Sequence, residues 1–243
     1  MAKGKGRGGP RGDYYKKVLG MYPSNLFCLY RMNERSGTAL SDWSNGANHG
    51  TYGSVALVND RGPDRHWCAH FDGTASYADI YSTDFNTDFS EAAGTIAGWA
   101  KVNTAAVWAD ATKRRIITIA ADANNYACID KSATTNRVDF FYVGGGTSDS
   151  VTSTILAATG DWFHVAVTVS VAGDLLTAYI NGASVGTATT LGTWAGALSS
   201  TATVIGSSST TAADVWSGWL SNIAVWNNVL SADEIKDLAN LYG

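Results

Sequence analysis

Carboxylate pairs are the first chemistry to look for, because glycoside hydrolysis needs two carboxylates about 5–9 Å apart across the bond that is cleaved. The chain has only three glutamates, and none has a second acid two residues away on a predicted strand: Glu34, Glu91 and Glu234. Asp233 and Glu234 follow Ser231 in a pattern typical of a helix start, which gives both acids a structural role. We therefore expect no catalytic residues and no enzyme activity.

Metal chemistry requires several histidine, cysteine or acidic side chains that converge on one point, and zinc takes three or four of them. The chain has four scattered histidines and three widely spaced cysteines: His49, His66, His70, His164, Cys28, Cys68 and Cys128. No C-x-x-C motif is present, and a chain of this size folds without a disulfide framework. We expect buried apolar thiols and no zinc site.

Aromatic side chains are the next candidates, because sugar rings stack on them and exposed aromatic patches mark interaction surfaces. The chain has nine tryptophans and eleven tyrosines. Four tryptophans fall in strand patterns and are expected mostly in the core: Trp99, Trp162, Trp216 and Trp226. Three fall in predicted loops, and we predict that they form exposed platforms for glycan stacking: Trp43, Trp108 and Trp194.

The net charge of −4 is divided unevenly along the chain. Residues 1–12, which we call the basic arm, hold four cations and no acid, so the other 231 residues carry −8. The cations of the arm are Lys3, Lys5, Arg7 and Arg11. Such an arm either stays a solvated tail or docks on an acidic protein surface and becomes ordered there. Nucleic-acid binding is disfavoured, because four charges without interleaved aromatic residues bind weakly and lose affinity with salt.

The overall composition describes a folded domain. Hydrophobic residues make up 45% of the chain, which is enough for a core and excludes a disordered chain. No stretch approaches the roughly 18 apolar residues of a membrane span. No apolar signal-peptide segment follows the N-terminal charges, so we expect a protein that is either made and used in a cytoplasm or released by lysis as part of a particle. One domain is expected over residues 13–243.

Short runs with alternating faces, separated by turns rich in small polar residues, predict an all-β chain. In the run 162–170, Phe163, Val165 and Val167 share one face, with His164 on the other. Asn181-Gly182 predicts a hairpin, because both residues can adopt a positive φ. The predicted strands include the runs 95–101, 116–120, 137–143, 162–170, 175–180 and 183–189.

Two short helices are predicted at the ends of this β region. The first covers residues 14–19, with Asp13 as its N-cap. The second begins at Ser231, which forms a capping box with Glu234 and should place Ile235 and Leu238 on the sheet. Leu241 is a further candidate for that contact. Many strands in one uninterrupted segment predict a two-sheet antiparallel sandwich or jelly roll.

Several motifs occur in a fixed order along residues 14–240. They are 26–34 (LFCLYRMNE), 42–51 (DWSNGANHGT), 71–77 (FDGTASY), 95–99 (TIAGW), 162–166 (WFHVA), 179–182 (YING) and 218–235. Together they resemble the concanavalin A-like lectin/glucanase superfamily, in its laminin-G-like jelly-roll branch. The resemblance implies a jelly-roll sandwich with short N-terminal and C-terminal helices, and says little about activity, because this fold hosts many functions.

The same resemblance makes Asp42 a calcium candidate, since some superfamily members hold a structural calcium near this loop. Those members have an acid after the closing G-x-[LI] motif, but Ser221 stands there in this chain. Calcium requires several oxygen ligands, preferably charged. We therefore expect no metal or cofactor.

Residues 14–34 are similar to the lead-in of laminin-G-like domains in bacteriophage structural proteins. With the basic arm and the missing catalytic acids, this resemblance predicts a non-enzymatic virion protein, either a capsid decoration protein or a tail or fibre component. Its partners would be a major capsid or tail protein and further copies of the chain, with no membrane involved. The alternative is a carbohydrate-binding or adhesion module on a cell or particle surface, with glycans as partners.

Overall fold

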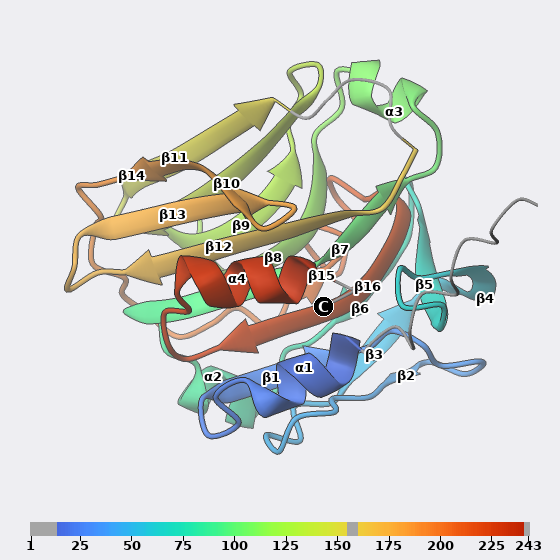
Figure 1. Ribbon diagram of the computed structural model, residues 1–243, viewed down its shortest axis with the longest axis horizontal. Helices are drawn as coiled ribbons and strands as arrows, with labels where there is room; N and C mark the ends of the chain where they lie inside the picture. The colour runs from blue at the N-terminus through green and yellow to red at the C-terminus, as the bar shows by residue number, and fades with distance from the viewer. Residues whose placement is uncertain (1–13, 155–159, 241–243) are drawn as a thin grey trace, which may run out of the picture.

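The structure is a computed structural model that describes residues 14–154 and 160–240, and these form two stacked antiparallel sheets (Figure 1). Sheet A contains β1 (Leu26–Tyr30), β4 (Ala56–Arg61), β5 (Trp67–Asp72), β7 (Ala93–Val102), β12 (Phe163–Ser170), β13 (Leu175–Ile180), β14 (Ala183–Ala188) and β16 (Ser217–Trp226). Its strand order is β14-β13-β12-β7-β16-β5-β4, and β1 also pairs with β16.

Sheet B contains β2 (Ala39–Leu40), β3 (Gly50–Gly53), β6 (Tyr77–Asp79), β8 (Arg114–Asp122), β9 (Asn125–Lys131), β10 (Arg137–Gly144), β11 (Thr147–Thr154) and β15 (Val204–Ile205). Its order is β11-β10-β9-β8-β15-β6-β3-β2. Every strand pair in both sheets is antiparallel, and many neighbours are far apart in sequence. This arrangement confirms the predicted all-β sandwich.

The main core lies between the sheets and follows the alternation of the strands. Phe163, Val165 and Val167 of β12 point into this core, whereas His164 and Ala166 point to the outer side of sheet A. Two short helices close the core at its edges, α2 (Thr83–Asp88) with Phe85 and α3 (Ala106–Ala109) with Trp108. The period of two read from the sequence therefore assigns the faces of β12 correctly.

A second apolar cluster lies on the outer face of sheet A, under α1 (Tyr14–Gly20) and α4 (Ala232–Ala239). In Figure 1 both helices lie in front of sheet A. They bury Tyr14, Val18, Ile235 and Leu238 against the outer side chains of the strands, Trp226 among them. Both predicted helices are present, and Ser231 and Glu234 form the complete capping box.

Local predictions elsewhere are also confirmed. Asn181 and Gly182 have φ angles of 50° and 79° and join β13 to β14 as a hairpin. The three cysteines are buried and free. None of the helices among the described residues is long and apolar enough to cross a membrane. The predicted cap Asp13, the basic arm and Leu241 lie outside the described residues.

Candidate functional site

The predicted exposure is wrong for two of the three tryptophans that were candidates for glycan stacking. Trp108 is completely buried, because α3 turns its indole inward to within 5.5 Å of the Phe163 ring. Trp194, on the connection between β14 and β15, is 7% exposed and packs against Phe89 and Tyr142. Both lie in segments without long secondary structure, but each segment folds back onto the core. Neither indole offers a face to a sugar.

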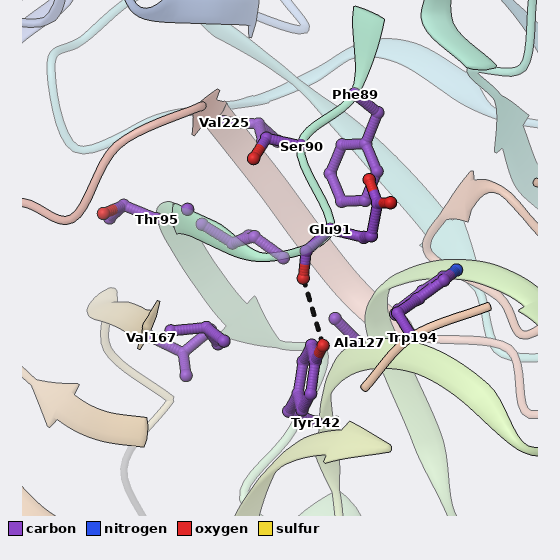
Figure 2. A pocket seen from close by; sticks show the side chains of 12 residues that line it. Phe89, Ser90, Glu91, Thr95, Ala127, Tyr142, Val167, Trp194 and Val225 are labelled. Carbon is purple, nitrogen blue, oxygen red and sulfur yellow. Dashed lines mark hydrogen bonds between the residues drawn. The ribbon is translucent and has the colours of Figure 1, made fainter. Parts of the chain in front are cut away.

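Trp194 instead lines a small apolar cavity at one end of the sandwich, which Figure 2 shows from close by. Phe89 and Val225 line it as well, and the Tyr142 hydroxyl donates a hydrogen bond of 3.1 Å to the carbonyl oxygen of Glu91 beside it. The cavity holds only about 30 Å³. That volume suits one water molecule and excludes a sugar ring.

Trp43 is the exposed member of the predicted set, with 44% of its surface accessible. It follows Asp42, whose backbone forms an isolated β-bridge with Tyr30 at the end of β1. The Trp43 amide donates a 2.8 Å hydrogen bond to the carbonyl of Leu29. The indole is therefore mounted on a loop whose backbone is fixed to a buried strand.

The Asp42 carboxylate organises this loop from inside. Its Oδ1 accepts hydrogen bonds from the amides of Leu29 and Ser44, both at 2.8 Å. Its Oδ2 accepts from the Ser44 hydroxyl at 2.8 Å and from the Asn48 amide at 2.9 Å. Each carboxylate oxygen thus holds two donors of the chain, an arrangement that fits a loop anchor rather than a calcium ligand. Within the described ranges, no group of three His, Cys, Asp or Glu could hold a metal.

The back of the Trp43 indole rests on a guanidinium group. The Arg31 Cζ atom lies 4.8 Å from the centroid of the Trp43 ring and 3.9 Å from that of Tyr15, which α1 supplies. The two rings are 6.4 Å apart and inclined at 60°. Only 6% of Arg31 is exposed, so the cation is enclosed by its aromatic neighbours. Desolvated contacts of this kind contribute about 2 kcal/mol. We call Tyr15, Arg31 and Trp43 the Trp43 platform.

The backbone beneath the platform is also fixed. The Arg31 carbonyl accepts a 3.3 Å hydrogen bond from the amide of Asn222, which lies at the bulge of β16. The Asn222 side chain in turn donates to the Asp64 carboxylate at 3.1 Å. The platform therefore joins α1, the end of β1 and the middle of β16. Its aromatic surface is held in place before any ligand arrives, which lowers the entropic cost of binding.

Sequence reasoning identified Trp43 and missed its partners. Tyr15 lies in a predicted helix and Arg31 in a predicted strand region, and nothing local indicates that they meet Trp43. A second group was missed for the same reason, where Trp219 of β16 is contacted by Lys101 at 4.6 Å and by the His70 ring at 4.9 Å. These neighbours leave Trp219 only partly exposed, and the Trp43 platform is therefore the better stacking surface.

Other predicted binding residues fall outside what the structure describes. The arm residues Lys3, Lys5, Arg7 and Arg11 belong to this part of the chain. Their contact with a partner remains a prediction.

Solved structures with the same fold include several toxin binding domains, whereas no curated protein matches the chain significantly. The receptor binding domain of botulinum neurotoxin mosaic serotype C/D matches with a TM-score of 0.68 and 13% identity, over 89% of this chain and 51% of that one. The binding domain of Paraclostridial Mosquitocidal Protein 1 matches with 0.66 and 14%, over 90% and 53%. This chain thus spans about half the length of these toxin domains.

A third similar structure is nearly equal in length. Domain 4 of AbnA, a GH43 extracellular arabinanase from Geobacillus stearothermophilus solved in complex with arabinotriose, matches with a TM-score of 0.63 and 18% identity. The match covers 89% of this chain and 98% of that domain. At these identities the likeness concerns the fold alone.

Family membership rests on the sequence. The family model Laminin_G_3 matches residues 72–236, about two thirds of the chain, from the end of β5 into α4. The two-sheet antiparallel sandwich agrees with this match. The chain belongs to the concanavalin A-like lectin/glucanases superfamily.

Proposed function

We propose that this protein is a carbohydrate-binding module that stacks a sugar ring on Trp43. The observation that carries the proposal is the asymmetry of the Trp43 platform: Arg31 is enclosed behind the indole, whereas Trp43 itself is 44% exposed. An indole that is fixed from behind and open to solvent provides a rigid apolar face, and such aromatic surfaces are common anchors in recognition.

The comparisons support a binding role more than a catalytic one. Among the similar structures, the arabinanase domain was solved with arabinotriose, and the toxin domains are named for receptor binding. These ligands belong to those proteins, and their transfer to this chain is part of the proposal. A catalytic role would require accessible paired carboxylates, and no such pair lies at the Trp43 platform.

The test is a screen of the full chain on a glycan array that includes arabinotriose, followed by calorimetry with each bound glycan. Trp43→Ala should lower the affinity about tenfold, because stacking on one aromatic ring contributes up to about 1.5 kcal/mol beyond the area it buries. Trp43→Phe should retain part of the affinity. Tyr22→Ala is the matched control, since Tyr22 is equally exposed and lies outside the platform.

A virion role is a second proposal, favoured by the separation of the basic arm from an acidic domain. In this proposal the arm anchors the protein to an acidic capsid or tail surface, and the domain with its glycan platform faces outward. Deletion of residues 2–12 should reduce the amount of the protein in purified particles, measured by quantitative mass spectrometry. Particles fully loaded with the truncated protein would contradict the anchor and leave the glycan proposal intact.

A further inference from the structure

The outer face of sheet B differs from that of sheet A, because no helix of the described residues lies on it (Figure 1). Along β9, Ala127 and Ile129 point into the core, so the alternate residues Tyr126, Cys128 and Asp130 point outward. These outward side chains are aromatic, polar and charged. Tyr126 is partly exposed, whereas Cys128 and Asp130 are completely buried and are contacted by Arg115.

A groove of about 450 Å³ lies on this face over β8. Arg115, Thr118 and Ala120 of β8 line its floor, and Tyr126 lines one side. The segments that flank β15 line the other side with Ser199 and Ser208. A volume of several hundred Å³ is typical of small-molecule sites, and it exceeds that of the cavity beside Trp194 by more than tenfold.

The walls of the groove are held by hydrogen bonds to β8. The Ser199 amide donates to the carbonyl of Ala120 at 2.7 Å. The Thr118 hydroxyl donates to the carbonyl of Ser207 at 3.1 Å. These bonds connect the floor to the opposite wall. The hydroxyl oxygens of Thr118, Ser199 and Ser208 can each still accept a hydrogen bond from a ligand in the groove.

Arg115 is the most constrained side chain of the groove. One of its terminal nitrogens forms an ion pair of 3.2 Å with the completely buried Asp130 and also contacts the Cys128 sulfur. Its Nε lies 3.9 Å from the Asp214 carboxylate and has no hydrogen-bond partner among the described residues. The guanidinium is thus fixed in orientation. Its Nε is buried, and the 11% of the side chain that is exposed lines the groove. The Tyr126 ring centroid lies 5.9 Å from the Arg115 Cζ atom.

The charges around the groove select the ligand. Arg115 and Lys113 are opposed by three carboxylates, those of Asp122, Asp130 and Asp214. This balance does not favour an anion. One partly exposed guanidinium, several hydroxyl groups and one aromatic ring match a neutral polyhydroxylated ring, whose hydroxyl groups both donate and accept hydrogen bonds.

We propose that the groove formed by Arg115, Thr118, Tyr126, Ser199 and Ser208 is a second binding site, specific for a neutral saccharide. It shares no residue with the Trp43 platform and stands or falls separately from it. Two sites on one domain would let the protein bind multivalent glycan surfaces more tightly than either site alone.

The test is a nuclear magnetic resonance titration of the ¹⁵N-labelled full chain. The probes are the neutral sugars glucose, galactose, mannose, arabinose and lactose, with glucuronate and galacturonate as charged counterparts. At least one neutral sugar should shift the amide signals of Thr118, Tyr126 and Ser208 and saturate at millimolar concentrations. The corresponding uronate should bind more weakly.

Variants separate this site from the rest of the protein. Tyr126→Ala should weaken binding about tenfold, as expected for one stacked ring, and Tyr126→Phe should retain it. Tyr126→Leu keeps the bulk of the side chain if the alanine variant fails to fold. Trp43→Ala and Tyr77→Ala, the latter on β6 of the same sheet, should leave the groove signals unchanged.

Three results would overturn the inference. The first is that no neutral probe shifts the groove signals, even where Trp43 signals respond. The second is unchanged affinity in the folded Tyr126→Leu variant. The third is tighter binding of a uronate than of its neutral counterpart, which would contradict the assigned ligand class.

Discussion

The two sheets of the sandwich share one core and differ on their outer faces. On sheet A the outward positions beneath α1 and α4 are mostly apolar, such as Trp99, Ala166 and Trp226, and the two helices cover them. On sheet B the outward positions of the central strands include Arg115, Asp130 and Asp139, and no described helix covers them. The alternation along a strand therefore determines both faces of a sheet. The inward residues form the core, and the type of the outward residues determines whether a helix packs on the outer face.

The same contrast distinguishes the surface that stabilises the fold from the surfaces that we propose bind ligands. The helix-covered outer face of sheet A forms a second core, and its aromatic rings pack against the helices. Both candidate binding surfaces lie outside this cover, the Trp43 platform at the edge of α1 and the groove on the outer face of sheet B. The predictions below test this division by comparing the two faces.

The largest effect is expected from removing an aromatic anchor of the covered face. Trp226 is completely buried under α1 and donates a 3.0 Å hydrogen bond to the carbonyl of Met21. Trp226→Ala should lower the free energy of unfolding by about 3–5 kcal/mol, measured by urea denaturation. Phe141→Ala, on the outer face of sheet B, should cost less than half as much. Equal losses of unfolding free energy in the two variants would show that the outer face of sheet B is packed as tightly as the helix-covered face of sheet A.

The second effect is a pH dependence that originates under the helices. Burial lowers the pKa of His164 to about 3 from its ordinary value of 6.5. As the pH falls below 6.5, the unfolded chain binds a proton that the folded chain rejects. The resulting stability is present above pH 6.5 and is lost toward pH 3, by up to about 1.4 kcal/mol per pH unit. His164→Gln should remove this slope, and parallel curves for both proteins would refute it.

The outer face of sheet B should show a smaller pH dependence of stability, with the opposite sign. Burial raises the pKa of Asp130 to about 6 from 3.8, with Arg115 partly opposing the shift. The folded protein therefore binds this proton first, so protonation between pH 6 and 4 favours the folded state. The difference in unfolding free energy between the wild-type protein and Asp130→Asn should rise as the pH falls through this window. A flat difference would mean that Asp130 is better solvated than its burial indicates.

The smallest effect concerns the end of the covering helix. Ser231→Ala removes the hydroxyl oxygen that accepts a hydrogen bond from the Glu234 amide. The free energy of unfolding, measured by thermal or urea denaturation, should fall by about 1 kcal/mol. Ser150→Ala, on an exposed position of β11, should change stability by less than about 0.5 kcal/mol. A loss at Ser231 no larger than that at Ser150 would mean that the cap contributes nothing to the cover.

The parts predicted from the sequence are those that local chemistry determines. The Asn181-Gly182 hairpin and the capping box at Ser231 depend on residues within a few positions of one another, and both are present. The strand pattern and the ordered motifs likewise predicted the sandwich, since each strand carries its own alternation.

The site could be predicted only in part, because it depends on contacts between distant segments. Trp108 and Trp194 lie in loops, but the path of each loop returns to the core, which no local pattern reveals. The pairing of Asp130 opposite Asp139 requires the register of β9 and β10. A search for acids two residues apart on one strand cannot find such a pair.

The most direct test of the glycan proposal follows the indole N–H signals of the nine tryptophans during a titration with a glycan selected on the array. The account predicts that the Trp43 signal shifts and saturates with the calorimetric affinity, while those of the buried Trp108 and Trp226 stay in place. A stationary Trp43 signal during saturable binding would contradict the account.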